Sequence, residues 1–557
     1  MLPKTTKPAL QARRTFFLPI AGVFLYGLCA VLFTYPLVLN FGSAVISHWG
    51  IDIEHSLWVQ WWFAQALDTP GLAVFRTAML HYPNSVDLQF ADINFAINVP
   101  FYLLTKVASL TVAYNLMLLL SFVLSATLMW RLAYGVCGNR TAAWAAGGLY
   151  AASPYWLCCV LNAWVYLVHI WVFPLVFLAL GRAKNTLQAR DSVLCGLAFG
   201  LTFHVSPYYC LYLAVLVAAC MPWHISLILS LLRQRRGWTL FAIALVTMLL
   251  TVLPRALPMY AASHQEFVAH HGPLNTALGA RLAEMVTPSA ARVQQRLPGV
   301  GFLVVFLSYT LLGAIGAGLW VSERRRSYAP WLISGTALLI LSLGPYATLG
   351  SGDHAVTLPL PDYLLQRLPV FAFLTNHWRW SLPAVFSLVI GGALGLADIA
   401  RFLERRGYAS CAWMVALVLL VYGLEAFLLF PFPARKPLWP TLADPLCTAL
   451  RQTKDVNAVL DLTEFPKLHQ IEHRKPIAGG WLPRLEVRTF QASEEFYRGF
   501  AACKDPQAGI RYLGNLGIDA IILSKDSALL IRPDPQVPGA FTGQPLAVGS
   551  GLANHPL

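Results

Sequence analysis

The chain contains few charged residues. Of its 557 residues only 12% are Asp, Glu, Lys or Arg, whereas a soluble domain carries about 25%. At the same time 57% of the residues are hydrophobic, which is more than the core of a soluble protein can absorb. The shortage of charge therefore excludes an ordinary soluble protein and predicts a polytopic membrane protein.

The ten cysteines form no CxxC pair and show no metal-ligand spacing, which excludes the common zinc and thiol-redox motifs. Eight of them lie in or near apolar runs, where a free thiol behaves as a small hydrophobic side chain. The other two, Cys447 and Cys503, fall in the polar C-terminal region and could form a disulfide in an oxidising compartment. The chain also lacks a fixed-period repeat and a low-complexity segment.

The basic residues form no continuous patch, although the net charge is +14. They recur in short loops between apolar runs, which is the pattern of membrane topology signals and excludes a nucleic-acid partner. The apolar runs predict about eleven transmembrane helices, with the count open by two because Ser206-Pro207 divides one long stretch. The predicted spans are 16–36, 112–132, 141–156, 164–181, 192–206, 208–230, 238–256, 300–321, 329–347, 381–400 and 411–430.

The placement of charge predicts the orientation. The N-terminal segment and every second loop are rich in Lys and Arg, and the acids in those segments are only Asp191, Glu323 and Glu404. The positive-inside rule therefore predicts a cytoplasmic N-terminus and a C-terminus outside the cytoplasm. We expect a transmembrane domain over residues 1–431 and a small extracytoplasmic α/β domain over residues 432–557, which we call the tail.

The first outer loop, about residues 37–111, contains the candidate catalytic acids. In an extended segment Asp52 and Glu54 would face the same way, so they could hold a divalent cation, or one could accept a proton from a hydroxyl. The alternative is a solvated loop in which Asp52 is only the N-cap of a helix. Trp58, Trp61 and Trp62 follow at helical spacing, which predicts a helix lying along the outer membrane surface, with sugar stacking as a second possibility.

Further polar residues stand near the predicted outer ends of spans. Asp92 is a candidate second catalytic or metal-binding acid, and Arg379 is placed to bind a lipid phosphate in bidentate geometry, with His377 beside it. Arg255 has a similar position at the end of another span. Glu425 lies inside the last span, where an acid is costly, so we expect it to pair with an Arg of a neighbouring helix.

The order of several short motifs resembles that of a poorly characterised group of bacterial membrane proteins with the architecture of GT-C glycosyltransferases. In that group an acid in the first outer loop is followed six residues later by Trp, then by Tyr-Pro, then by Ala-Tyr-Asn-Leu. The matching residues are Asp52, Trp58, Tyr82-Pro83, 113–116, 153–155, 171–175, 368–371 followed by Arg379, and, in the tail, 459–462, 475–480 and 516–518. The resemblance covers nearly the whole chain.

The chain departs from the pattern of the group at two places. The group often has Gly directly before the acid, whereas Ile51 separates Gly50 from Asp52 here, which leaves the choice between Asp52 and Glu54 open. The group often has a further Arg before the one at position 379, where this chain has Thr375, Asn376 and His377.

The resemblance implies a bacterial inner-membrane enzyme that transfers a sugar from a polyprenyl-phosphate donor to a glycan, lipid or protein acceptor outside the cytoplasm, with inversion. It implies Asp52 as the base, with Glu54 and Asp92 as further catalytic candidates. Substrate-binding candidates are Arg379, His377, Arg255, Trp58 and Tyr82. We predict no metal as a certain cofactor, with a divalent cation left open.

Two other functional classes fit the same composition. A lipid or solute transporter, such as a flippase, also has many spans, but it usually shows internal repeats and carries its acids at mid-bilayer depth. A noncatalytic assembly protein for envelope polysaccharide would fit if Asp52 were dispensable.

Overall fold

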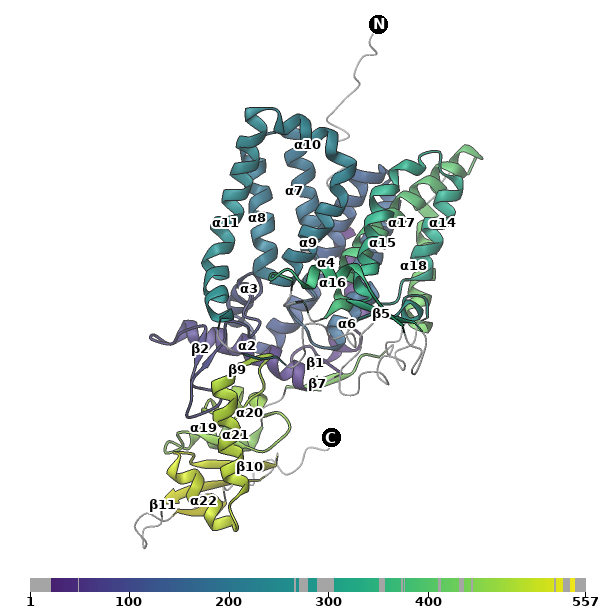
Figure 1. Ribbon diagram of the computed structural model, residues 1–557. Coiled ribbons are helices and arrows are strands. Elements are labelled where there is room, and N and C mark those ends of the chain that lie inside the picture. Colours follow the sequence, from purple (N-terminus) through teal and green to yellow (C-terminus); the bar gives the residue numbers. More distant parts are fainter. Residues whose placement is uncertain are drawn as a thin grey trace.

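The computed structural model describes most of the chain. The described residues are 22–48, 50–264, 267–269, 279–287, 305–349, 356–371, 374, 376–408, 412–429, 435–441, 444–524, 527–533 and 541–545. A bundle of long helices forms one end of the molecule and the tail forms the other (Figure 1). The predicted spans 16–36, 300–321 and 411–430 fall partly outside the described residues.

Among the described residues, three helices are long and apolar enough to cross a membrane. They are α4 (Leu110–Cys137), α11 (Arg235–Ser263), and α17 (Ser381–Arg405) together with the 3-10 turn η6 (His377–Trp380) that precedes it. The apolar window of α17 is 94% buried and that of α11 only 6% buried. α17 therefore lies at the centre of the bundle, while α11 presents leucines outward as a lipid-facing helix does.

Shorter apolar helices complete the bundle, and the count of eleven spans stays a prediction. They are Gly22–Phe33, α5 (Arg140–Ala151), α6 (Pro154–Leu161), α7 (Val172–Thr186), α8 (Ala189–Val205), α9 (Pro207–Cys220), α10 (Ile225–Leu232), α14 (Tyr309–Val321), α15 (Ala329–Ser342) and α18 (Ala412–Leu428). Ser206 adopts an extended conformation between α8 and α9, as its position before a proline favours. The helix predicted from residue 164 begins only at Val172, because residues 164–171 form a buried irregular segment.

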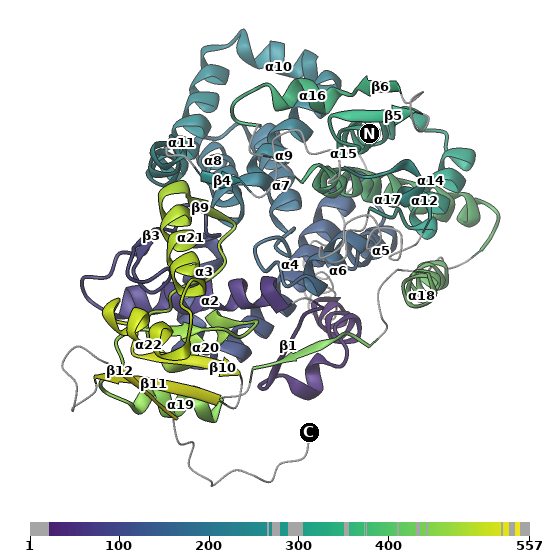
Figure 2. The same ribbon diagram turned by 60° about the horizontal axis from the view of Figure 1, so that its bottom comes forward.

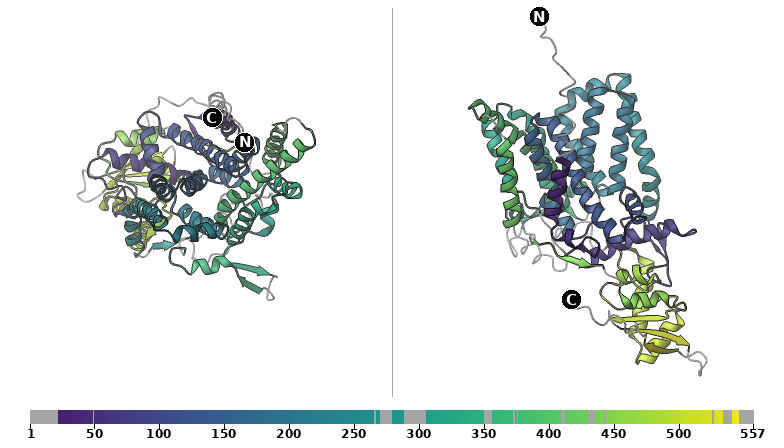
Figure 3. Two further views of the ribbon diagram at one scale, coloured as in Figure 1. Left: turned by 90° about the horizontal axis from the view of Figure 1, so that it is seen from above. Right: turned by 180° about the vertical axis from the view of Figure 1, so that it is seen from behind.

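The segment predicted as the first outer loop folds into several elements at the base of the bundle, between the long helices and the tail (Figures 1 and 3). They are η1 (Leu37–Asn40), β1 (Ala44–Ile46), α2 (Gly50–Asp68), β2 (Arg76–Thr77), β3 (Val86–Asp87) and α3 (Phe95–Thr105). The expected extended segment at Asp52 is wrong, because this residue lies in the first turn of α2. Being inside the helix, Asp52 is also not the N-cap that the alternative interpretation required.

The tail contains a mixed four-stranded sheet with the order β12-β11-β10-β8. Its strands are β8 (Val459–Asp461), β10 (Ala520–Ser524), β11 (Ser527–Pro533) and β12 (Phe541–Pro545), and its helices are α19 (Pro445–Gln452), α20 (Pro466–His473), α21 (Val487–Ala501) and α22 (Pro506–Asn515). β8 and β10 are parallel, and the other neighbouring pairs are antiparallel. The crossover from β8 to β10 contains α20, α21 and α22, the helical connection that parallel strands require.

Two strand pairs join the tail to the rest of the chain. β7 (Leu438–Pro440) pairs with β1, and β9 (Arg484–Glu486) pairs with β4 (Phe267–Ala269), both in antiparallel register. Viewed with its base forward, the molecule shows α20 beside α2 (Figure 2). A further pair, β5 (Tyr346–Leu349) with β6 (Val356–Pro359), precedes α16 (Pro361–Gln366), and α12 (Leu282–Val286) precedes α14.

Two expectations about single side chains are wrong. Cys447 and Cys503 are both free thiols, so no disulfide joins them. Glu425 pairs with the start of α14 rather than with an Arg: it accepts hydrogen bonds from the Ser308 hydroxyl at 2.8 Å and from the Thr310 N–H at 3.0 Å. The first N–H groups of a helix lack internal partners and attract negative charge, which satisfies this acid inside the span.

Candidate functional site

The tryptophans of α2 form part of the protein core rather than a membrane-facing surface. Trp58 is 0% exposed, and its Nε1 donates to Oε1 of Gln470 in α20 at 2.6 Å. Trp62 stacks on Trp58 with 6.0 Å between ring centres and donates to the Val74 carbonyl at 3.0 Å. The predicted contact of these rings with the membrane surface is therefore wrong, because the tail covers them. Burial of Trp58 also does not favour its predicted role in substrate binding.

The helical conformation separates the two acids of the Asp-x-Glu motif. Residues two apart in an α-helix point about 200° away from each other, so Asp52 and Glu54 face different surroundings. Glu54 is 2% exposed, and its Oε1 accepts a hydrogen bond from the backbone N–H of Lys467 at 2.5 Å. Burial raises the pKa of Glu54, while the charge of Lys467 opposes that rise. Glu54 thus holds the first turn of α20 against α2.

A glycine permits this close approach. A Cβ added to Gly50 would lie 2.0 Å from Cε1 of Phe465, the residue two before Lys467. The Phe465 ring is itself packed edge-on against Trp439, with ring centres 4.7 Å apart. A larger residue at position 50 would therefore require the Phe465 ring to move.

Lys467 extends from the tail into the centre of the site. Its ammonium donates to the Trp481 carbonyl at 2.7 Å and lies 3.1 Å from Nδ1 of His55. Burial lowers the pKa of Lys467 to about 8, and the nearby Glu54 and Asp52 partly oppose this. Burial likewise lowers the pKa of His55 to about 4, so the imidazole is neutral at pH 7.

The charge on Lys467 fixes the tautomer of His55. Because the ammonium can only donate, His55 Nδ1 is the acceptor and Nε2 carries the proton. This Nε2 lies 3.5 Å from Oδ2 of Asp92. Asp92 has a left-handed backbone, with φ +58°, and its carbonyl accepts from the Asn94 amide at 3.2 Å. Lys467 of the tail thereby orients the His55 ring so that its Nε2–H faces the Asp92 carboxylate.

Asp52 lies on the other side of this cluster and keeps part of its surface exposed. Burial raises its pKa to about 6, while a hydrogen bond from the Trp164 side chain and the charge of Arg379 hold the value down. The Asp52 carboxylate is therefore largely ionised at pH 7, with a pKa close enough to neutrality for proton transfer. Asp52 and Asp92 are also the two carboxylates here that could hold a divalent cation, since Glu54 is engaged with Lys467.

Arg379 stands in η6, at the end of the central span α17, and is 5% exposed. Its guanidinium carbon lies 5.3 Å from the ring centre of Trp164 and 5.5 Å from that of Tyr208. The Arg379 Nε–H is buried without a hydrogen-bond partner among the described residues. The site thus contains a cation with a free donor beside a carboxylate, which suits a phosphate group.

The remaining residues predicted to bind substrate contact other parts of the protein. Arg255 donates to the Gln89 carbonyl at 2.6 Å and covers the Phe75 ring. His377 is fully buried, with Nδ1 2.7 Å from Oδ2 of the equally buried Asp362. The Tyr82 backbone N–H donates to the tail at the Ile477 carbonyl. The roles predicted for these three residues stay predictions.

Four residues of the cluster were not predicted from the sequence. They are His55, Trp164, Lys467 and Trp481. His55 could have been noticed as the neighbour of Glu54. Lys467 gives only a weak signal, a lysine after Phe-Pro at the start of a short helix, and nothing local relates it to Asp52.

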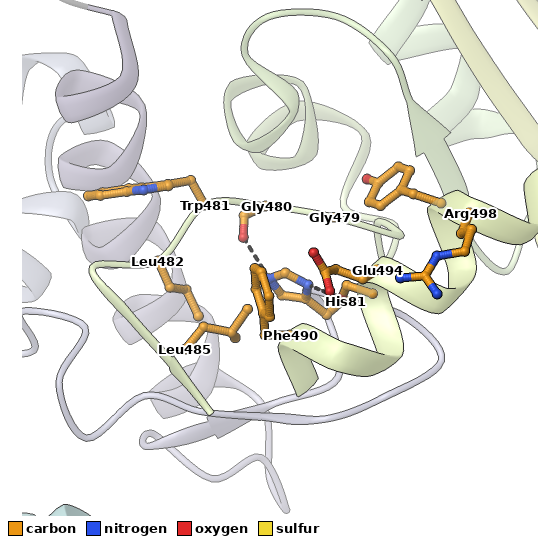
Figure 4. A pocket seen from close by; sticks show the side chains of 11 residues that line it. His81, Gly479, Gly480, Trp481, Leu482, Leu485, Phe490, Glu494 and Arg498 are labelled. Atoms are coloured by element: carbon orange, nitrogen blue, oxygen red, sulfur yellow. Dashed lines mark hydrogen bonds between the residues drawn. The ribbon is translucent and has the colours of Figure 1, made fainter. Parts of the chain in front are cut away.

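A pocket of about 470 Å³ opens in the tail beside the cluster (Figure 4). Aromatic rings of Trp481, Phe490 and Tyr497 line it together with the charged Glu494 and Arg498. Trp481 lines the pocket and also contacts the acid cluster, because its ring meets His55 edge-on with ring centres 5.5 Å apart. His81 forms the floor, held by Ser493 at 2.8 Å and by the Gly480 carbonyl at 2.7 Å. The pocket therefore shares a wall with the acid cluster.

Comparison with known proteins identifies the fold. No protein-family model and no curated protein matches the sequence. The structure is similar to the arabinofuranosyltransferase AftD from mycobacteria, with a TM-score of 0.53 and 15% identity over 90% of this chain and 35% of AftD. A mutant form of AftD gives a TM-score of 0.52 with 16% identity, over 90% of this chain and 36% of that one. The chain thus spans about a third of the length of AftD.

The archaeal oligosaccharyltransferase AglB from Archaeoglobus fulgidus, solved with an inhibitory peptide and a dolichol-phosphate, gives a TM-score of 0.45. Its identity is 13%, over 91% of this chain and 69% of AglB. The likeness to AftD confirms the predicted GT-C architecture at the level of the fold.

Proposed function

We propose that this protein is a membrane glycosyltransferase that moves a sugar from a polyprenyl-phosphate donor to an acceptor hydroxyl outside the cytoplasm. The observation that carries the proposal is the buried Arg379, whose Nε–H has no partner among the described residues and whose charge lowers the pKa of Asp52, in a chain with the fold of AftD. A proton acceptor and a cation for the leaving phosphate are the two groups that this transfer needs.

In the proposed reaction, the acceptor hydroxyl oxygen attacks the anomeric carbon and gives its proton to Asp52. The bond from that carbon to the phosphate oxygen breaks, and the lipid phosphate leaves with the bonding electrons. Attack opposite the phosphate inverts the anomeric configuration. Arg379 stabilises the negative charge that develops on the phosphate, and Asp92, held by His55, orients the acceptor.

The pocket at Trp481 is the proposed binding place of the acceptor. Its rings and charged groups suit a sugar, which offers apolar C–H faces between hydroxyl groups. A chain bound there would approach the acids past Trp481. With this arrangement we propose that residues 1–431 form the membrane part, and that residues 432–557 form an extracytoplasmic part that binds the acceptor.

Two alternatives predict different behaviour. In a transporter the acids would lie along a path at mid-depth, whereas Asp52 and Asp92 lie in the first outer loop, at the base of the bundle. In a noncatalytic assembly protein the Asp52 carboxylate would be dispensable. A free donor on the buried Arg379 beside an ionised acid favours the transferase.

The test is transfer of labelled sugar from polyprenyl-phosphate donors in proteoliposomes. We expect Asp52→Asn to lower the rate by about 10²- to 10⁴-fold, the size of general-base catalysis. Asp68→Asn is the matched control, because Asp68 ends the same helix but forms an exposed pair with Lys106. Equal loss in both variants, or full activity in Asp52→Asn, would overturn the assignment. Labelled lipid crossing the bilayer without any transfer would identify a transporter.

A further inference from the structure

Three potential metal ligands gather in the tail, away from the acid cluster. Asp444 is the N-cap of α19, Cys447 lies in the first turns of the same helix, and His469 comes from α20. One ligand atom from each lies within 4.8 Å of the other two. We propose that these residues bind a zinc ion that fastens α19 to α20. The proposal is independent of the glycosyl transfer.

The orientation of His469 fits this role. Its Nδ1 lies 2.8 Å from Oδ2 of Asp461 at the end of β8, which leaves Nε2 as the nitrogen for a metal. A carboxylate bonded to the far nitrogen of a ligand histidine is a recurring feature of zinc sites, because it fixes the ring and makes it more basic. The Asp461 carboxylate is in turn held by Thr463, at 2.9 Å from its backbone N–H.

The set of donors selects the kind of metal. Cys447 supplies sulfur from a fully buried position, and His469 supplies nitrogen. Thiolate with imidazole favours zinc over magnesium or calcium, which prefer oxygen ligands. Asp444 supplies oxygen, and one of its oxygens already caps Leu446 at 2.7 Å. The Glu472 carboxylate accepts from the Asp444 N–H at 2.6 Å and lies outside the group of three, so a water would provide the fourth ligand.

The position on α20 gives the metal a structural purpose. Lys467 and Gln470 of this helix contact α2 through Glu54 and Trp58. His469 points instead toward β8. A zinc ion would therefore tie the other face of α20 to α19, and so hold the helix that brings Lys467 to the acid cluster.

The experiment uses the full chain in detergent, purified without a polyhistidine tag. We expect about one zinc per chain by elemental analysis, and a thiolate-to-metal absorption band after exchange for Co²⁺. Cys447→Ser and His469→Gln should lose both signals. Cys503→Ser is the control, since that cysteine lies in the tail but outside the group.

The possible results distinguish failure of the zinc site from failure of the proposed transferase. A wild-type protein that takes up no zinc and gives no thiolate band with Co²⁺ overturns the proposal, whether or not the variants fold. Retention of the band in Cys447→Ser also overturns it. Because both measurements report the metal directly, they stand even if no sugar transfer is found. Conversely, sugar transfer by a protein without bound zinc would support the proposed transferase and contradict only the zinc site.

Discussion

Glu54 and Lys467 are 413 positions apart and meet through a hydrogen bond of 2.5 Å, from the Lys467 backbone N–H to Glu54 Oε1. The Lys467 side chain then enters between His55 and the Trp481 carbonyl. Asp52, two residues before Glu54, instead accepts a hydrogen bond from the Trp164 side chain, and the charge of Arg379 lowers its pKa. The two acids of one short motif therefore have separate tasks, with Glu54 holding the tail and Asp52 remaining available for chemistry.

The first prediction concerns Glu54→Gln. Replacing the carboxylate by an amide keeps an acceptor for the Lys467 N–H but removes a charge from a buried pair, so unfolding should become easier by about 1–3 kcal/mol. Sugar transfer by the folded protein should fall far less than in Asp52→Asn. Thermal unfolding and transfer assays on both variants check this. If folded Glu54→Gln were as inactive as Asp52→Asn, Glu54 would be the better candidate for the base.

The second prediction is the pH dependence of transfer. Burial raises the pKa of Asp52 to about 6, and only the ionised carboxylate can accept a proton. The rate constant kcat/KM should therefore be level above the pKa and fall about tenfold per pH unit below it. His55, with a pKa of about 4, stays neutral near pH 6 and does not produce this change. A profile that stays level through pH 6 would contradict Asp52 as the base.

The third prediction concerns the effect of Lys467 on the pH dependence of kcat/KM. The Lys467 charge lowers the pKa of Asp52, together with the Trp164 hydrogen bond and Arg379. Lys467→Met removes the charge, so the acid limb of kcat/KM should shift to higher pH, by up to about one unit. Lys454→Met, at an exposed lysine of the same tail, is the control and should leave the limb in place. A purely structural role for Lys467 would lower activity without moving the limb.

Much of the bundle could be predicted from the sequence. The runs at 112–132, 238–256 and 381–400 correspond to α4, α11 and α17, because a long apolar run has few other structures available to it. The roles proposed for Asp52 and Arg379 followed from the resemblance rather than from any local pattern. These two residues are more than 300 positions apart, and only the fold brings the charge of Arg379 near enough to lower the pKa of Asp52.

Other features depend on neighbours that a local pattern does not contain. The spacing of Trp58 and Trp62 predicts a helix with an apolar face, but it does not distinguish a lipid neighbour from the tail. The pairing of β1 with β7 joins residues near positions 45 and 439, and strands of three residues give little sequence signal. Lys467 became part of the site only through such long-range contacts.

The fourth prediction compares two arginines. Arg379→Lys keeps the charge but loses the planar fork that binds two phosphate oxygens, so transfer should fall by about 10²-fold. Arg255→Lys is the matched control, because Arg255 binds the Gln89 carbonyl and covers Phe75. It should change thermal stability more than the apparent affinity for the lipid donor. If Arg255→Lys lost transfer and Arg379→Lys kept it, Arg255 would be the better candidate for the phosphate-binding residue.

The fifth prediction tests the pocket as the acceptor site. Trp481 is 38% exposed and Tyr497 41% exposed, so both rings can stack against a sugar while their edges stay packed. Trp481→Ala should raise the KM for the acceptor about 3- to 10-fold, the equivalent of about 1 kcal/mol of stacking, and leave the KM for the donor unchanged. Trp413→Ala, at an exposed ring on α18, should alter neither constant. The variant keeps the Trp481 carbonyl that accepts from Lys467, and it loses the ring contacts with the Lys467 ammonium and with His55. An unchanged acceptor KM would exclude the pocket as the acceptor site.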